Sequence, residues 1–187
     1  MAERRSPAAA FAGRFETASE SGALRLAELP FLTHVNVRVD PASPAADEVA
    51  GVLGVPLPTE PGTAVRSGEL TVAWLGPDEW LVIGPEGFRY ELLRKAVADG
   101  RGSVVDVSAQ RTTMLVAGPR ARDVLAHGCA LDLHPSVFGP GRCAQTTLAR
   151  TQVVLLPQQD GFLVLVRSSF AAYLAAWLLD AATEHLR

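Results

Sequence analysis

Charged side chains inside apolar runs are the first candidates for chemistry in this chain, and Asp106 is the clearest example. It lies within 104–107, a run of valines, where an ionised carboxylate needs a partner such as Arg111, a backbone N–H or a ligand. Most inward carboxylates pair with a structural partner. Structural pairing is therefore the favoured role of Asp106, and contact with a ligand is the alternative.

Asp78 and Glu79 form a second group of carboxylates, adjacent in the sequence where a strand is predicted to begin. Neighbouring strand residues point to opposite faces of a sheet, so these two side chains cannot share one substrate proton. We predict a turn role for Asp78, because Asp160 recurs at the matching turn later in the chain.

The two cysteines and their neighbouring histidines could be metal ligands. Cys129 and Cys143 have neither Cys-x-x-Cys spacing nor a histidine pair at zinc-finger distance. His127 and His134 flank Cys129, but His127 is predicted in the last turn of a helix, where an imidazole suits the negative end of the helix dipole. Two ordinary, partly buried thiols are favoured over a zinc site.

Common enzyme fingerprints are absent from the sequence. It contains no Gly-x-x-x-x-Gly-Lys, Gly-x-Gly-x-x-Gly or Gly-x-Ser-x-Gly, which removes the usual phosphate-binding loops and the serine-hydrolase elbow. A formal net charge of -3 over 187 residues gives no basic surface, so no nucleic acid partner is expected. No apolar run approaches the roughly 20 residues that span a bilayer, and no secretory signal is recognisable, so we expect no membrane contact and predict a cytoplasmic location.

The elements that would position these residues follow a pattern that occurs twice. Residues 78–83, followed by Phe88 and Leu92, are matched by 160–165, followed by Phe170 and Leu174. Each copy reads as a turn, a strand and a helix, and each is preceded by a further strand, helix and strand. This pattern predicts an α+β fold built from duplicated βαββα units, of the split βαβ, ferredoxin-like type.

The pattern also predicts how the chain is organised. Residues 1–22 show no sustained period and are predicted to be a flexible N-terminal arm. Residues 23–187 are predicted to form a single α+β domain of two repeats, at about 23–100 and 101–187. Trp80 and Phe162 are predicted to be equivalent core residues of the two repeats.

The final predicted helix is unusually apolar, and Ser168 or Ser169 is expected to cap it. A large apolar stripe is predicted to face the chain's own sheet: Phe170, Tyr173, Leu174, Trp177 and Leu178. The other faces carry Ala172, Ala175, Ala176 and Leu179, which we predict lie against a partner subunit. The alternative is that alanine is only a good helix former on an ordinary surface.

Six segments, taken together, closely resemble one family. They are 75–81, 105–113, 118–125, 128–135, 143–146 and 166–174. Their order and spacing resemble the gamma subunits of heterotetrameric sarcosine oxidase over roughly residues 20–187. That family in turn resembles the folate-binding region of the glycine-cleavage aminomethyltransferase, matched here by 106–108 and 118–125, which agrees with the duplicated α+β prediction.

The resemblance implies a non-catalytic, structural subunit of a flavoenzyme complex that oxidises sarcosine to glycine and passes the one-carbon unit to tetrahydrofolate. It implies alpha, beta and delta subunits as partners, with FAD, FMN, NAD, tetrahydrofolate and zinc on those partner chains and no cofactor on this one. The aminomethyltransferase carries a glycine-rich stretch ending in a catalytic acidic pair where this chain has 147–152, without glycine or aspartate. We therefore assign no catalytic, cofactor-binding or metal-binding residue to this chain.

Two other functions remain open at this point. The chain could be a stand-alone folate-binding or one-carbon-transfer protein, which would require Asp106 and Arg111 to line a pocket. It could also be a subunit of a related oxidase that acts on another N-methyl amine.

Overall fold

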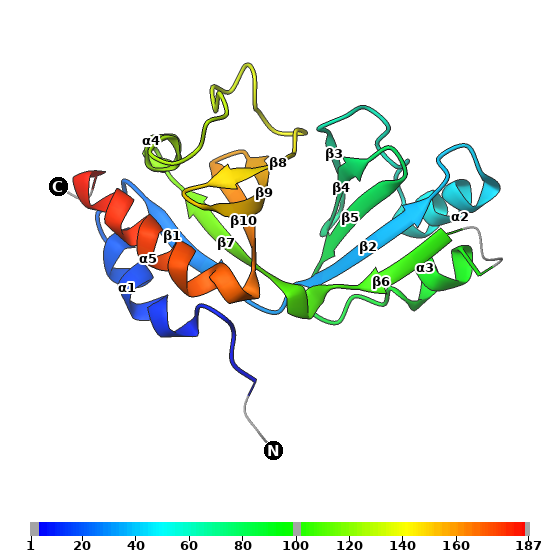
Figure 1. Cartoon of the computed structure of the whole chain (residues 1–187), viewed down its shortest axis with the longest axis horizontal. Coiled ribbons are helices and arrows are strands. Elements are labelled where there is room, and N and C mark those ends of the chain that lie inside the picture. The colour runs from blue at the N-terminus through cyan, green and yellow to red at the C-terminus, as the bar shows by residue number, and fades with distance from the viewer. Residues whose placement is uncertain (1–3, 99–101, 186–187) are drawn as a thin grey trace. The chain divides into compact units, whose positions relative to one another are not determined.

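The structure is a computed structural model that describes residues 4–98 and 102–185. Within this described part, the strands form two five-stranded sheets, each with its own helices (Figure 1). The chain divides into two compact units. We call them the β2 unit (Phe31–Ala109 and Gly141–Ala144) and the β7 unit (Met1–Pro30, Gln110–Pro140 and Gln145–Arg187).

The β2 unit contains a sheet with strand order β3-β4-β5-β2-β6. Its strands are β2 (Thr33–Val39), β3 (Ala64–Ser67), β4 (Leu70–Gly76), β5 (Glu79–Gly84) and β6 (Gly102–Asp106). The valines at 35, 37 and 39 alternate along β2 and are each at most 2% exposed, as a strand with one buried face requires.

Two helices supply the other half of that core, α2 (Pro44–Leu53) and α3 (Glu91–Ala96). Val49, Leu53 and Leu93 from these helices join Trp80 of β5 in one buried cluster. α2 begins at Pro44. The first N–H groups of a helix have no partner within the helix, so proline, which lacks an N–H, costs no hydrogen bond there. α2 ends before Gly54, whose φ of 73° lies in the left-handed region that favours glycine.

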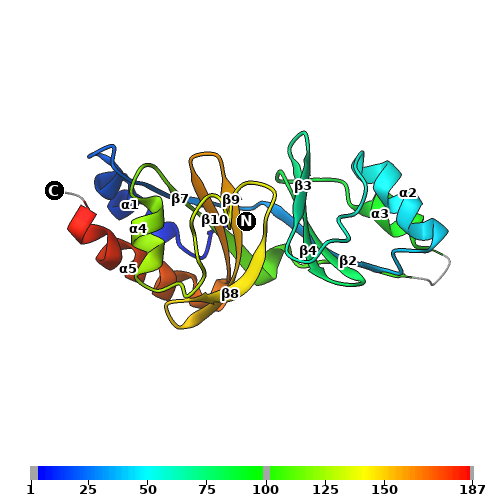
Figure 2. The same cartoon turned by 90° about the horizontal axis from the view of Figure 1, so that it is seen from above.

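The β7 unit contains the second sheet, with strand order β1-β7-β10-β9-β8. Its strands are β1 (Arg25–Leu29), β7 (Arg111–Ala117), β8 (Ala144–Leu148), β9 (Thr151–Gln158) and β10 (Gly161–Arg167). Its helices are α1 (Ala12–Ser19), α4 (Ala121–Ala126) and α5 (Ala171–Ala182), which lie together in this unit (Figure 2). α4 and α5 contact β10, while α1 contacts β1 and α5.

The two sheets are duplicates in strand order, and the duplication extends to single hydrogen bonds. Strands β3, β4, β5 and β2 correspond to β8, β9, β10 and β7. The carbonyl oxygen of Asp78 accepts a hydrogen bond from Val39 N, and that of Asp160 accepts one from Gly118 N, at 3.1 and 2.8 Å. These bonds confirm the turn role predicted for Asp78, and the α+β duplication with it.

The edge strands are exchanged between the repeats. β1 precedes β2 in the chain but pairs with β7, while β6 follows α3 and pairs with β2. The predicted limits of about 23–100 and 101–187 divide the chain differently, because each range contains an edge strand that joins the other sheet.

Residues 4–22 differ from the flexible arm that the sequence predicts for 1–22, of which residues 1–3 lie outside the described residues. Ala9–Phe11 form a 3-10 turn that continues into α1, where Phe15 and Ala18 are buried. The carboxylate of Glu28 on β1 accepts bonds from Ala8 N and from the Ser6 hydroxyl. The helix is short and has few apolar residues, which is why its stripe is not evident in the sequence.

The buried face of α5 is rotated from the predicted one. Leu174 and Leu178 are buried as predicted, but Phe170 and Tyr173 are 44% and 42% exposed, and Ala175 is fully buried. The prediction assigned the aromatic residues to the buried face, whereas Ala175 and Leu179, which were predicted to lie against a partner, are buried beside the two leucines. The predicted serine cap is also wrong: Ser168–Phe170 form a 3-10 turn, and α5 follows it without a side-chain cap.

Candidate functional site

Asp106 has a structural partner in the β2 unit. Its Oδ1 accepts hydrogen bonds from Ser108 N at 2.9 Å and from Ser108 Oγ at 2.6 Å. These bonds hold the pKa of the Asp106 carboxyl below its usual range. Ser108 Oγ in turn accepts from His34 N at 2.9 Å, so Asp106 orients the side chain that joins this turn to β2. The carboxylate is exposed rather than inward-facing, which contradicts its predicted position and supports its predicted structural role.

Asp78 and Glu79 bind different partners, as their opposite faces require. Asp78 forms a two-oxygen ion pair with Arg38 Nη2, at 2.8 and 3.0 Å, and this bond raises the pKa of Arg38. Glu79 Oε1 accepts a bond from Asn36 Nδ2 at 2.7 Å. Both carboxylates therefore hold the end of the β2–β5 pair.

Cys143 is buried and hydrogen-bonded within the β2 unit. Its Sγ lies 3.1 Å from Thr63 O and 3.3 Å from Trp74 O. Burial raises the pKa of the Cys143 thiol to about 11, so the group is a neutral thiol near pH 7. A thiol in that state is a poor nucleophile and a poor metal ligand.

The remaining predicted metal candidates are dispersed. Cys129 is a buried free thiol. The ring of His127 stacks edge-on against that of His185 at 5.6 Å, while His134 Nδ1 lies 2.7 Å from Ser136 Oγ. Across residues 4–98 and 102–185, no three His, Cys, Asp or Glu side chains gather as a possible metal site.

Over the same residues, no helix is long and apolar enough to cross a membrane.

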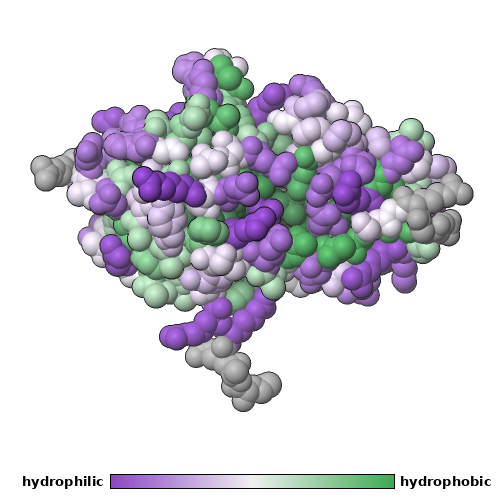
Figure 3. All heavy atoms as spheres, viewed as in Figure 1, coloured by the Kyte–Doolittle hydropathy of each residue, from purple (hydrophilic) through white to green (hydrophobic). Residues whose placement is uncertain are grey.

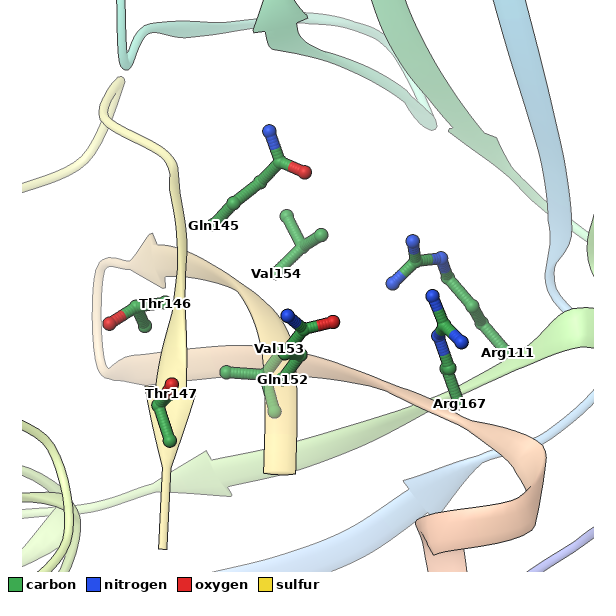
Figure 4. A pocket seen from close by; sticks show the side chains of 8 residues that line it. All are labelled: Arg111, Gln145, Thr146, Thr147, Gln152, Val153, Val154 and Arg167. Atoms are coloured by element: carbon green, nitrogen blue, oxygen red, sulfur yellow. The ribbon is translucent and has the colours of Figure 1, made fainter. Parts of the chain in front are cut away.

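A polar pocket of about 270 Å³ lies in the β7 unit, on strands β7, β8, β9 and β10. Its described lining residues are Arg111, Gln145, Thr146, Thr147, Gln152, Val153, Val154 and Arg167. Figure 4 shows the guanidinium groups of Arg111 and Arg167 side by side, with the amide of Gln152 beside them. None of the described lining residues is acidic.

Part of this pocket coincides with a stretch that the sequence singles out. Thr147 and Gln152 belong to 147–152, the stretch for which the sequence predicts no catalytic residue. The sequence names Arg111 as a partner for Asp106 and, in the folate-binding alternative, as lining one pocket with it. The described lining of this pocket includes Arg111 but not Asp106. Arg167 is not predicted as a site residue. Arg167 lies far from Arg111 in the chain, and only strand register brings the two together.

Comparison with known proteins gives consistent matches along the chain. The sequence model of the sarcosine oxidase, gamma subunit family matches residues 37–184. The sarcosine oxidase subunit gamma of Corynebacterium sp. (strain P-1) is 40% identical over 184 residues, covering 97% of this chain and 91% of that protein. The subunit gamma of an Arthrobacter species is 41% identical over 185 residues, with the same coverage.

Solved structures show the same likeness in three dimensions. A chain of the heterotetrameric sarcosine oxidase from Corynebacterium sp. U-96, solved in complex with pyrrole 2-carboxylate, superposes with a TM-score of 0.92. The two chains are 35% identical, and the match covers 98% of this chain and 97% of that one. The glycine cleavage system aminomethyltransferase T from Bartonella henselae shares the fold, with a TM-score of 0.65 and 16% identity, over 88% of this chain and 48% of that one.

Proposed function

Since this chain belongs to the sarcosine oxidase gamma subunit family, we propose that it is the gamma subunit of a flavin-dependent heterotetrameric sarcosine oxidase, with a structural role in assembly. The complex would demethylate sarcosine oxidatively to glycine and transfer the one-carbon unit to tetrahydrofolate. The observation that carries the proposal is the superposition, at a TM-score of 0.92, on a chain of such a heterotetramer over nearly the whole of both chains.

The chemistry of the described residues is consistent with a non-catalytic role. The carboxylates that the sequence nominates are held by Ser108, Arg38 and Asn36, and Cys143 is a buried neutral thiol. In this proposal FAD, FMN, NAD, tetrahydrofolate and zinc belong to the alpha, beta and delta subunits. The complex would work in the cytoplasm.

The exposed face of α5 is our proposed contact with a larger subunit. Phe170, at the end of the 3-10 turn before α5, and Tyr173, in the first turn of α5, are three positions apart and form an exposed aromatic stripe. Phe170 and Tyr173 are among the large apolar or aromatic side chains left exposed in the described part of the chain. Figure 3 shows green and white atoms, interspersed with purple ones, over the region where α5 runs. Aromatic residues of this kind often anchor protein interfaces.

The test is co-purification of the tagged chain from its native cell. We expect larger, flavin-bearing chains to accompany it in constant ratio, and sarcosine-dependent peroxide production to appear only in that assembly. The chain purified alone should be colourless and inactive on sarcosine. A stoichiometric flavin spectrum on the isolated chain, or the absence of any flavin-bearing partner, would contradict the proposal.

A further inference from the structure

The outer edge of β1 is covered by the chain's own N-terminal segment, a name we use for residues 6–19. β1 lies at one end of the β7 unit's sheet and pairs with β7 alone in that sheet. On such an edge strand, the N–H and C=O groups of alternate residues point away from the sheet and can pair with another chain. Leu26 N is one of these outward groups, because it donates to Ser19 Oγ of α1 at 3.0 Å.

The hydroxyl of Ser19 is oriented to receive that bond. Ser19 Oγ donates to Phe15 O, one turn earlier in α1, at 2.7 Å, so its lone pairs are available to the N–H of Leu26. The same Oγ lies 3.5 Å from Leu26 O. One side chain of α1 therefore covers both outward backbone groups of Leu26.

Glu28, two residues further along β1, anchors the start of the N-terminal segment. Its Oε1 accepts hydrogen bonds from Ala8 N at 3.1 Å and from Thr112 Oγ1 of β7 at 2.6 Å. Its Oε2 accepts one from the hydroxyl of Ser6. Because backbone groups alternate along a strand, the N–H of Glu28 points to the same outer edge as that of Leu26. The segment is thus tied to β1 near both of its ends by polar contacts, which can break and re-form.

Little apolar surface adds to these polar contacts. The buried side chains of the N-terminal segment are Ala8, Phe15 and Ala18. A helix as short as α1, with eight residues, is not stable by itself in water. Elements with few buried apolar contacts open at a lower free energy than the whole domain unfolds. The bonds of Ser19 and Glu28 therefore control how often the edge of β1 is uncovered.

We propose that the N-terminal segment is a releasable cover of β1, and that the uncovered edge pairs with the β1 edge of a second copy of this chain. Two antiparallel strands related by a twofold axis exchange equivalent backbone bonds, so a strand edge is complementary to itself. β1 carries one positive and one negative side chain, Arg25 and Glu28, so two copies carry no net charge against each other. The inference goes beyond the assembly role, because it concerns the chain before it meets another subunit.

Analytical ultracentrifugation of the full chain, purified alone, tests the pairing. Glu28→Ala removes the acceptor of three bonds, so we expect it to dimerise with a Kd at least about tenfold lower than that of the wild type. Glu28→Pro loses the same acceptor and also an outward N–H, a change that edge strands tolerate in their own sheet, so it should stay monomeric. Glu16→Ala, at an exposed glutamate of α1, is the matched control and should behave as the wild type does.

Hydrogen exchange measures the cover directly, without a change on β1. In Ser19→Ala the amide of Leu26 loses its acceptor and should exchange at least about tenfold faster, while that of Leu165 in the sheet interior should keep its rate. Ser21→Ala is the matched control, since Ser21 Oγ accepts from Ala23 N and not from β1. Unchanged exchange at Leu26 in Ser19→Ala would overturn the cover.

The oligomeric state of the variants decides whether the uncovered edge pairs. Ser19→Ala should dimerise more strongly than the wild type, and this measurement decides the question if the Glu28 variants do not fold. A Ser19→Ala chain that stays monomeric although Leu26 exchanges faster would overturn pairing with a second copy. Dimers of Glu28→Pro as strong as those of Glu28→Ala would show that another surface associates, and would overturn it too.

Discussion

The indole Nε1 of Trp80 donates a hydrogen bond to the carbonyl oxygen of Pro58 at 2.8 Å, and both residues are buried. Residues 55–62, with their three prolines, form the long connection between α2 and β3. The bond therefore fastens an irregular segment to the centre of the β2 unit's core. Phe162 holds the same place in the β7 unit, second in its strand and fully buried, without a comparable polar group.

Truncating either core aromatic should destabilise the chain strongly. Trp80→Ala and Phe162→Ala should each lower the free energy of unfolding by about 3–5 kcal/mol, because each leaves a large cavity. Trp80→Phe keeps most of the apolar volume but leaves the Pro58 carbonyl without its donor, which should cost about 1–3 kcal/mol. Urea unfolding measures all three. If both alanine variants lowered the free energy of unfolding by less than about 1 kcal/mol, Trp80 and Phe162 would not lie in the cores of the two units.

Gly161 should tolerate no side chain, because β10 approaches β7 closely there. A Cβ atom at Gly161 would lie 2.5 Å from the Cα of Ala117, its register partner, so backbone would have to move. Gly161→Ala should therefore lower the melting temperature by several degrees. Gly51, inside α2, has no neighbouring atom within 4 Å of an added Cβ, so Gly51→Ala is the matched control and should stabilise by about 0.5–1 kcal/mol. Equal melting temperatures for both variants would contradict the close approach.

Substitutions at the adjacent residues Ala175 and Ala176 of α5 should affect folding and subunit assembly differently. Ala175 is fully buried, so Ala175→Glu should unfold or strongly destabilise the chain by burying an unpaired charge. Ala176 is exposed, so Ala176→Glu should leave the circular dichroism spectrum and melting temperature of the isolated chain unchanged. In the cell, Ala176→Glu should reduce co-purification of the larger subunits, since it places a charge beside the exposed aromatic stripe. Undiminished co-purification would remove α5 as the proposed contact.

The buried Cys143 thiol should contribute to the free energy of unfolding, and this contribution should disappear at high pH. The folded thiol has a pKa of about 11 against an ordinary value of 9.0, so the folded state holds its proton more tightly than the unfolded chain. That contribution is complete below pH 9 and is lost as the pH rises from 9 to 11, amounting to about 2–3 kcal/mol. The difference in unfolding free energy between the wild type and Cys143→Ala should therefore shrink between pH 8 and pH 10.5. All other groups titrate in both proteins, so a constant difference would show that the thiol is not protected by burial.

Local patterns in the sequence were sufficient to predict most strands, the turns at Asp78 and Asp160, and the repeat that defines the α+β fold. Alternation of valines along 35–39 and the turn residues act within a few positions, and such short-range chemistry is visible without a structure. The family was also evident from ordered segments of the sequence. In the same way, Trp80 and Phe162 could be assigned to two equivalent cores.

Tertiary structure alone decided the features that depend on which elements meet. The local pattern predicts β6 as a strand but not which sheet edge it joins, and β1 was not predicted as a strand. An edge strand gains its hydrogen bonds from whichever sheet lies within reach, so its place depends on the tertiary structure. The apolar surface of α5 is nearly continuous, so its buried face was set by the close packing that Ala171 and Ala175 permit. Arg111 and Arg167 face each other because β7 and β10 pair in one register, and a shift of a single residue would place their side chains on opposite faces of the sheet.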